Sequence, residues 1–269
     1  MIELLAPALA VCLLLAGVLC YFGLHVLLRE VIFVDLALAQ LAALGVATAH
    51  LLLPEASPAA TYLTSFSLAL LGAAIFAFLR LDQQRVPQEA VIGIVYGVSA
   101  ALVILVLSKT ALDRDEIEAM LTGRLLFVEW SEIGTSALIC VAIALVHVAF
   151  RRPFFEISRR RRAVARPARR ERLLDFLFYA SFGVVVTSAV QMAGVLVVFS
   201  LLIVPAASAA VLVASIRGRL LAGWGIGAAA SAAGVAGSAI WDLPTGASVV
   251  ATLGIVFALS LAGAAVLRD

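Results

Sequence analysis

The chain has 269 residues, of which 64% are hydrophobic and only 13% are charged, and its formal net charge is +2. Because a soluble domain carries about 25% charged residues, this composition excludes an ordinary water-soluble protein and predicts one that crosses a membrane several times. The small net charge gives no reason to expect a nucleic-acid partner. The three cysteines, Cys12, Cys20 and Cys140, each stand alone in an apolar run, so neither a disulfide framework nor a zinc site is indicated.

Nine hydrophobic segments each come close to the ~20 residues that a helix needs to cross a bilayer. In chain order they are residues 4–28, 31–53, 61–79, 89–108, 133–150, 173–190, 193–215, 219–240 and 245–267. The sixth and seventh are so close that eight full spans with one broken or re-entrant half helix is an open alternative. We therefore predict an all-α, polytopic transmembrane helix bundle of about eight to nine spans. No connection is long enough for a soluble domain, so residues 1–269 are expected to form a single transmembrane domain.

Basic residues predict the orientation, since loops on the cytoplasmic side carry an excess of Lys and Arg. The segments expected on that side are Arg29, 80–85, 151–172, 217–219 and Arg268. The connections 54–60 and 241–245 carry no Lys or Arg and are expected outside. This alternation places the N-terminus outside and the C-terminus in the cytoplasm. The mixed-charge connection 109–132 is then external, and its apolar pattern predicts a short interfacial helix.

Polar residues inside the predicted spans are candidates for a translocation path, because burying them in lipid is costly. Gln40 lies near the middle of the second span and is the strongest candidate; the alternative is a static hydrogen bond between helices. Asp35 and His50 lie toward the two ends of the same span; contact with water is an equally good explanation for Asp35 and the better one for His50. Gln191, in the short connection between the sixth and seventh spans, is a candidate for facing a cavity.

Ten arginines fall between Arg151 and Arg172. Such a cluster attracts anionic lipid and enforces the orientation of the chain. The same segment begins with two adjacent aromatic residues, Phe154 and Phe155, followed by Glu156. Aromatic anchors dominate protein interfaces, so we also predict a short helix here that inserts into a cytoplasmic partner.

Small residues at a spacing of four predict close contacts between helices. Gly93 and Gly97 form one such pair, and Gly223 and Gly227 form another. Whether each pair faces the helix bundle or another subunit stays open. A proline in a span, such as Pro205, is tolerated only where its surroundings satisfy the carbonyl that it frees.

The chain lacks the pattern Gly-x-x-x-x-Gly-Lys-Ser/Thr that cradles nucleotide phosphates. We therefore expect neither ATP binding nor another cofactor on this chain, and no catalytic residue. Signatures of membrane-embedded proteases and of lipid hydrolases are missing as well. The function predicted from these observations is transport rather than catalysis.

Four segments of the chain resemble, in order and spacing, the permease family of bacterial ABC importers for zinc, manganese and iron. They are Leu38-Ala-Gln-Leu-Ala-Ala-Leu-Gly45, Glu89-Ala-Val-Ile-Gly93-Ile-Val-Tyr96, Met120-Leu-Thr-Gly-Arg-Leu-Leu126 and Gly194-Val-Leu-Val-Val-Phe-Ser-Leu-Leu-Ile-Val-Pro205-Ala-Ala-Ser208-Ala. Within them, Gly93, Gly194, Pro205 and Ser208 are the motif residues to which the resemblance gives a structural role.

The resemblance implies a permease subunit of a bacterial plasma (inner) membrane that works as a homodimer by alternating access. Two separate ATPase subunits would hydrolyse ATP and dock on residues 154–158, where Phe154, Phe155 and Glu156 are the expected coupling residues. An extracytoplasmic solute-binding protein would deliver the substrate, and membrane lipid would surround the spans.

The chain also departs from the family pattern. Gln40 stands where the family has histidine, and Asp35 lies one residue before the position of the family's aspartate, which is Leu36 here. Glu156 replaces the aspartate that usually opens the coupling segment. Zinc and other borderline metals favour imidazole, which Gln40 does not offer. The metal ligands therefore stay unknown, and a metal ion, a metal chelate and another small solute all remain open as substrates.

Two other classes of function compete with the permease. A secondary transporter or channel usually needs acidic residues near the middle of the membrane, whereas the acidic residues of this chain lie near the ends of the spans. A membrane-anchored scaffold is less favoured still, since no soluble part is anchored.

Overall fold

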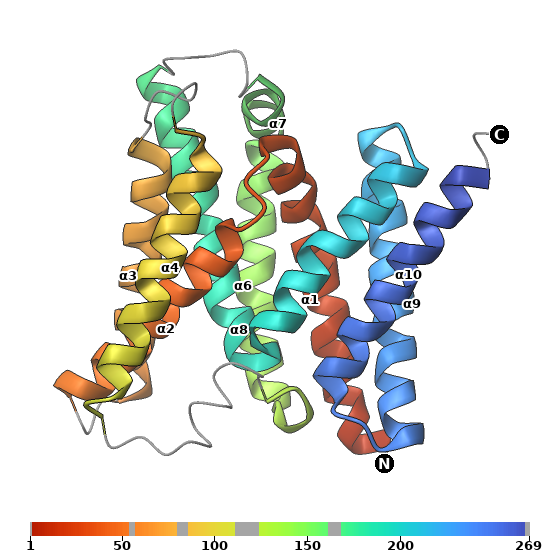
Figure 1. Cartoon of the computed structure of the whole chain (residues 1–269), viewed down its shortest axis with the longest axis horizontal. Helices are drawn as coiled ribbons and strands as arrows, with labels where there is room; N and C mark the ends of the chain where they lie inside the picture. The colour runs from red at the N-terminus through yellow and green to blue at the C-terminus, as the bar shows by residue number, and fades with distance from the viewer. Residues whose placement is uncertain (1, 54–56, 80–85, 111–123, 161–167, 267–269) are drawn as a thin grey trace. The chain divides into compact units, whose positions relative to one another are not determined.

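The computed structural model describes residues 2–53, 57–79, 86–110, 124–160 and 168–266. Over these residues the secondary structure is helical, with no strand. In chain order (Figure 1) the helices are α1 (Ile2–Arg29), α2 (Val34–Leu52), α3 (Pro58–Phe78), α4 (Gln88–Leu107), the short 3₁₀ helix η1 (Leu125–Phe127), α6 (Trp130–Ala149), α7 (Arg151–Arg160), α8 (Arg169–Leu212), α9 (Ile216–Trp241) and α10 (Thr245–Val266). The predicted interfacial helix depends mostly on residues 111–123, which lie outside the described residues.

Eight of the described helices are long and apolar enough to cross a membrane. The predicted all-α transmembrane fold of about eight to nine spans is therefore confirmed. The longest of the eight, α8, is interrupted at Gly194, whose φ of 77° and ψ of 161° are not helical. This backbone conformation is open essentially to glycine alone. It divides α8 close to the predicted junction of the sixth and seventh spans.

The chain forms two compact units, each assembled from separate stretches of sequence. Unit 1 comprises Met1–Leu27, Glu118–Val141 and Ala189–Asp269, and unit 2 comprises Leu28–Ile117 and Ala142–Ser188. Three helices, α1, α6 and α8, contribute residues to both units. That the whole chain acts as one domain stays a prediction.

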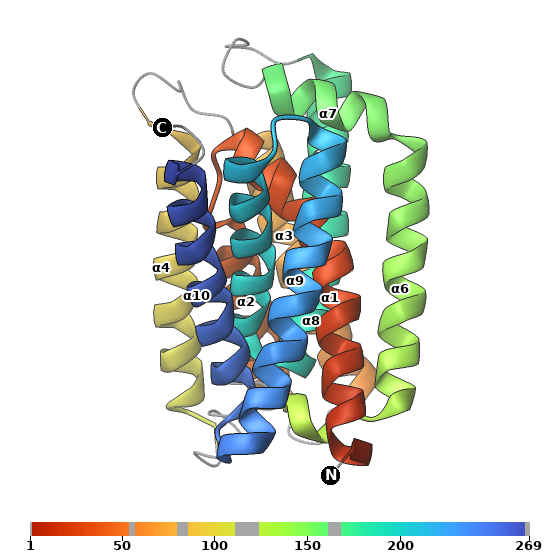
Figure 2. The same cartoon turned by 90° about the vertical axis from the view of Figure 1, so that its right-hand side faces the viewer.

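In unit 2, α2 packs against both α3 and α4 (Figures 1 and 2). Gly45 of α2 lies against the backbone of Ser65 in α3, and the Ser65 hydroxyl donates a 2.9 Å hydrogen bond to the Ala42 carbonyl. At the other contact, the backbone N–H of Phe33 donates to Glu89 Oε1 at 3.0 Å. Since Phe33 is the N-cap of α2, a carboxylate from α4 satisfies a backbone donor that the start of α2 would otherwise leave unpaired.

In unit 1, α9 and α10 form an antiparallel pair joined by residues 242–244 (Figure 1). A Cβ atom on Gly234 would lie 2.6 Å from the Cα of Val249, so the two helices touch through their backbones. The hydroxyl groups of Ser238 and Thr245 are hydrogen bonded at 3.0 Å near the turn. Small residues therefore set the closeness of this pair.

The two glycine pairs singled out in the sequence have different surroundings. Gly227 lies against Pro205 of α8, and Gly223 lies against Pro205 and Cys20, so this pair faces contacts inside unit 1. A Cβ atom on Gly93 or Gly97 of α4, by contrast, would meet no heavy atom of the described chain within 4 Å. The same spacing thus produces a packed helix face in one helix and an open face in another.

Candidate functional site

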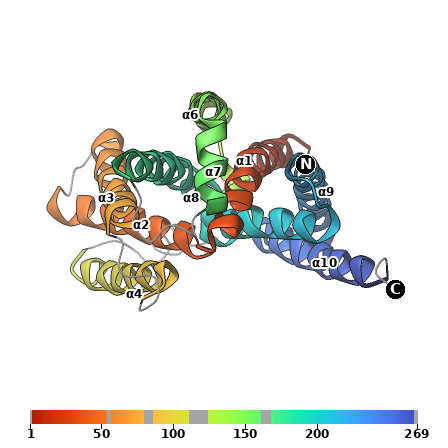
Figure 3. The same ribbon diagram turned by 90° about the horizontal axis from the view of Figure 1, so that it is seen from above.

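The short helix α7 has two chemically different faces. It follows α6 after a single residue, Phe150, and runs across the end of that helix (Figures 2 and 3). Phe154 and Ser158 are buried, and their spacing of four places them on one face. The opposite side carries the exposed residues Arg152, Glu156 and Arg159. The predicted short helix in the arginine-rich segment is therefore present, and one of its faces is held by the rest of unit 2.

An aromatic cluster holds the buried face of α7. The Phe154 side chain is 0% exposed. Its ring stacks on His147 of α6, with ring centroids 4.6 Å apart, and meets the Phe178 ring of α8 edge to face at 5.9 Å. His147 Nε2 is also hydrogen bonded to the Ser181 hydroxyl at 2.8 Å. Ring contacts of this kind add directional preference to apolar burial, so α6, α7 and α8 are fixed to one another here.

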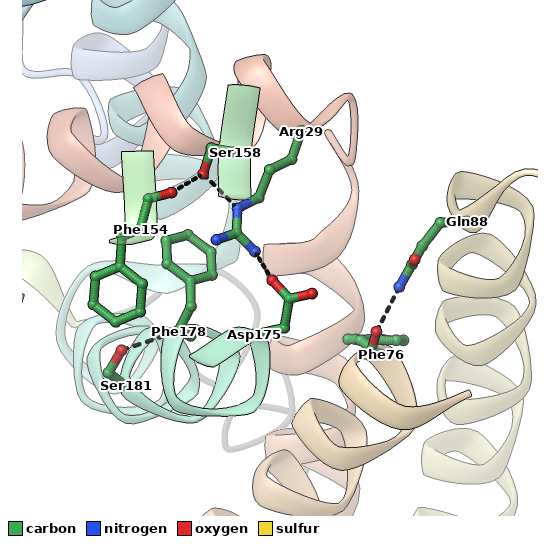
Figure 4. Close-up of polar contacts among 8 residues, drawn as sticks. All are labelled: Arg29, Phe76, Gln88, Phe154, Ser158, Asp175, Phe178 and Ser181. Atoms are coloured by element: carbon green, nitrogen blue, oxygen red, sulfur yellow. Dashed lines mark hydrogen bonds and ion pairs between the residues drawn. The ribbon is translucent and has the colours of Figure 1, made fainter. Parts of the chain in front are cut away.

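A buried guanidinium group adds a polar connection to this cluster (Figure 4). Arg29, the last residue of α1, donates from Nη1 to Asp175 Oδ1 and from Nε to the Ser158 hydroxyl, both at 2.8 Å. Its Cζ atom lies 3.8 Å from the centroid of the Phe178 ring, a cation–π contact. Ser158 in turn donates to the Phe154 carbonyl at 2.8 Å. We call Arg29, Ser158, Asp175 and Phe178 the Arg29 cluster.

The Arg29 cluster was not predicted from the sequence, where Arg29 served only to assign the orientation of the chain and Asp175 had no role. The signal that could have found the cluster is Asp175 itself, an acidic residue inside the apolar segment 173–190. An acidic residue in a membrane segment is costly unless it is paired. In the structure Asp175 is paired with Arg29, and both side chains are 0% exposed.

The predicted coupling residues do not share one environment. Phe154 differs from the expectation that it contacts a partner, because aromatic side chains of the same chain enclose its ring and leave none of it at the surface. Phe155 is half-buried, and Glu156 is exposed. Phe155 and Glu156 thus lie nearer the surface of α7, while Phe154 fixes the helix from behind; that any of the three contacts a partner stays a prediction.

The candidate path residues lie on two elements. Asp35, Gln40 and His50 belong to α2 in unit 2, whereas Gln191 belongs to α8 in unit 1 and is exposed. Asp35 is buried, with 1% exposure, and its Oδ1 atom has no hydrogen-bond partner among the described residues. Gln40 and His50 are half-buried.

Asp35 and Gln40 do not form a ready-made metal site. Their spacing of five residues turns their side chains to different sides of the helix, whereas a spacing of four would align them. Within the described part of the chain, no group of three or more His, Cys, Asp or Glu residues is placed to hold a metal ion. Their role in a path stays a prediction.

The motif residues of α8 lie in a tightly packed region of unit 1. Pro205 contacts Gly223 and Gly227 of α9, and Ser208 is 0% exposed. The Ser208 hydroxyl has no hydrogen-bond partner among the described residues. Close packing, rather than a polar network, thus surrounds the most distinctive segment of the sequence.

Comparison with known proteins identifies a transport family. The model of the ABC 3 transport family matches residues 1–264. The manganese transport system membrane protein MntC of Halalkalibacterium halodurans is 24% identical over 251 residues, covering 91% of this chain and 82% of that protein. The protein of the same name from Listeria innocua is 25% identical over 221 residues, covering 80% of this chain and 78% of that protein.

A solved structure has the same fold. PsaBC from Streptococcus pneumoniae, determined in complex with Fab, matches with a TM-score of 0.75 and 21% sequence identity. The match covers 96% of this chain and 90% of that chain. The two chains therefore share one arrangement of helices.

Proposed function

Since this chain belongs to the ABC 3 transport family, we propose that it is the permease subunit of an ATP-driven importer whose first candidate substrate is the manganese ion. Family membership makes it a membrane transport protein, and the two MntC relatives are manganese transport proteins. In this proposal two copies of the chain enclose the path in a bacterial plasma membrane. A separate ATPase hydrolyses ATP, and a solute-binding protein delivers the ion from outside.

The observation that carries the proposal is the two-faced helix α7. A partner that binds its outer face meets a helix that is already ordered, because Phe154 and Ser158 are buried behind it. Binding to a preorganised surface loses less conformational entropy than binding to a flexible one. The exposed residues Arg152, Glu156 and Arg159 offer charge for specificity and encounter. We therefore assign the ATPase docking surface to the outer face of α7.

This assignment also sets the orientation. A docked ATPase requires α7 in the cytoplasm, which agrees with the ten arginines of segment 151–172. The N-terminus is then outside and the C-terminus inside. Residues 161–167, which hold several of these arginines, lie outside the described residues.

The chemistry of the candidate path favours manganese over zinc. Gln40 offers an amide oxygen and Asp35 a carboxylate, and oxygen ligands suit manganese, whereas zinc binds well to imidazole and thiolate. His50 offers one imidazole, and the three cysteines are all buried. The oxygen donors among these candidate residues therefore support manganese as the first substrate to test.

The docking surface can be tested by purifying the permease together with its ATPase from detergent. Replacing both Phe155 and Glu156 by alanine should weaken the association by more than about 2 kcal/mol, or roughly 30-fold in Kd. Phe127→Ala is the control, since Phe127 is 74% exposed but lies outside α7; this variant should bind the ATPase normally. In liposomes that hold the complete importer, ATP should drive uptake of Mn²⁺ in preference to Zn²⁺.

If the double variant retains its ATPase at the level of the unmodified chain, the outer face of α7 is not the docking surface. The first turn of α9, at residues 217–219, is then the next candidate, because it carries two arginines on the side expected to be cytoplasmic. If uptake does not depend on ATP, the proposed function itself is wrong.

A further inference from the structure

We infer that Arg29 is a positioning residue that transmits movement of α7 to the start of α2, and so connects the docking surface to the candidate path. This inference rests on the proposed function, in which α7 docks an ATPase. All the residues that it uses belong to unit 2. Figure 4 shows the guanidinium group between Ser158 and Asp175.

Arg29 fixes α7 relative to α8. Its Nε atom donates to Ser158 of α7 and its Nη1 atom donates to Asp175 of α8, each at 2.8 Å. The donors of a guanidinium group are held in one rigid plane. The two acceptors are therefore held in one relative position, and the Phe178 ring, 3.8 Å from Cζ, restricts the plane itself.

Little chain separates Arg29 from α2. Glu30 adopts a left-handed conformation, with φ of 54°, and ends α1. Val31 and Val34 are both 0% exposed, and α2 begins at Val34. The backbone N–H of Val34 donates to the Val31 carbonyl at 3.3 Å. A connection this short, with buried residues at both ends, has little slack to absorb a displacement of Arg29.

The helix that follows, α2, carries three of the candidate path residues. Asp35 lies in its first turn, and Gln40 lies about one and a half turns further on. The N-cap residue Phe33 is also held by Glu89 of α4. A displacement that reaches the start of α2 therefore acts on Asp35 directly and on Gln40 through a continuous helix.

The kind of contact at Arg29 also matters. Apolar side chains can slide past one another with small changes in energy, and well-packed hydrophobic residues often hold helices as well as a buried ion pair does. A buried ion pair either moves as one body or breaks, because separating its charges in a low dielectric is costly. The ion pair thus makes the end of α1 move with α8, and the hydrogen bond from Arg29 Nε to Ser158 extends this coupling to α7.

The experiment measures how nucleotide changes the accessibility of position 40. The parent is the complete complex of permease and ATPase in liposomes, carrying Gln40→Cys, and the chain with unmodified Gln40 reports the background from the buried native cysteines. The rate of reaction with a charged methanethiosulfonate reagent is compared with and without ATP and vanadate. In the parent, nucleotide should change the rate by about fivefold or more, the low end of typical coupling between distant sites.

Two further variants test Arg29 in this parent. Arg29→Lys keeps the positive charge but loses the planar guanidinium group and its fixed donors. This variant should reduce the nucleotide-dependent change in reaction rate to less than about twofold. Asp175→Asn keeps an acceptor oxygen and the shape of the side chain, and it should give an intermediate loss. Both complexes should still bind the ATPase at the parent level, because the outer face of α7 is unchanged.

The outcomes separate the inference from the proposed function. If the parent does not bind an ATPase, the proposed function fails, and the inference falls with it. If the parent binds the ATPase but nucleotide does not change the reaction rate at position 40, only the inference is overturned. The same holds if the Arg29→Lys variant keeps the full nucleotide-dependent change in that rate. If the Arg29→Lys variant does not fold, the Asp175→Asn variant tests the inference instead. Retention of the full nucleotide-dependent rate change in Asp175→Asn also overturns the inference.

Discussion

Around Arg29 in unit 2 a buried guanidinium group joins helix segments through hydrogen bonds, whereas around Pro205 in unit 1 glycines let helices come into close contact. Arg29 satisfies Asp175 and Ser158 directly. Around Pro205, by contrast, the contacts of Gly223 and Gly227 are steric. Both regions lie inside predicted membrane segments or at their ends, where unpaired backbone and charge are costly.

The two regions should therefore be sensitive to different kinds of substitution. A polar cluster is vulnerable to the loss of a member, because the remaining charge stays buried without compensation. A glycine contact is vulnerable to added volume, because the neighbouring backbone has nowhere to move. Gly93 and Gly97 show that the Gly-x-x-x-Gly spacing alone does not create this vulnerability, since they face open space within the described chain.

The largest expected effect comes from breaking the polar cluster. Asp175→Ala removes the counter-charge of Arg29, and the loss of one partner of a buried ion pair typically costs about 3–5 kcal/mol. Equilibrium unfolding of the purified permease in mixed detergent micelles measures this cost. Glu156→Ala, which removes an exposed acidic residue from α7, is the control and should change the stability by less than about 0.5 kcal/mol.

A double variant sharpens the same comparison. Arg29→Met combined with Asp175→Leu replaces the ion pair by apolar side chains, and such replacements are often neutral or stabilising. The double variant should therefore be more stable than Asp175→Ala. If Asp175→Ala is as stable as the unmodified chain, the ion pair does not hold unit 2 together.

A smaller effect is expected from adding volume in unit 1. A Cβ atom on Gly23 would collide with the backbone carbonyl oxygen of Leu202, and overpacking of this kind typically costs about 1–3 kcal/mol. Gly17→Ala on the same helix is the matched control, because nothing lies within 4 Å of its new methyl group. This control should be neutral or gain up to about 1 kcal/mol from helix propensity. Equal stabilities for the two variants in micelles would contradict the backbone contact.

The sequence predicts most of the fold because long apolar segments leave few alternatives in a membrane. Even the division of α8 was visible as the narrow gap between the segments 173–190 and 193–215. The break itself falls at Gly194 because its backbone angles require glycine. The resemblance to a metal importer permease family also followed from sequence motifs, and the family match confirms the transport class over the secondary transporter and the scaffold.

The details of the site could not be predicted in the same way. Phe154 and Phe155 are neighbours on a helix, about 100° apart, so only one of them can face inward fully. The choice depends on His147 and Phe178, which come from other helices. The Arg29–Asp175 pair joins residues 146 positions apart, and a single sequence holds no periodic signal for such a contact.

The smallest expected effect is at Ser208, and it is measured by making the same substitution in both regions. Ser208→Ala in unit 1 removes a buried hydroxyl that has no partner among the described residues. Since an unsatisfied buried polar group costs free energy, this variant should be unchanged or more stable, by up to about 1 kcal/mol. Ser158→Ala in unit 2 removes the acceptor of Arg29 Nε and should be destabilising, because hydrogen bonds to charged groups contribute about 1.5–3 kcal/mol. Equilibrium unfolding of both variants in the same micelles shows whether each one is more or less stable than the unmodified chain. A loss of stability in Ser208→Ala comparable to that in Ser158→Ala would mean that the Ser208 hydroxyl does have a partner in the membrane, and the contrast between the polar Arg29 cluster and the sterically packed region around Pro205 would no longer hold.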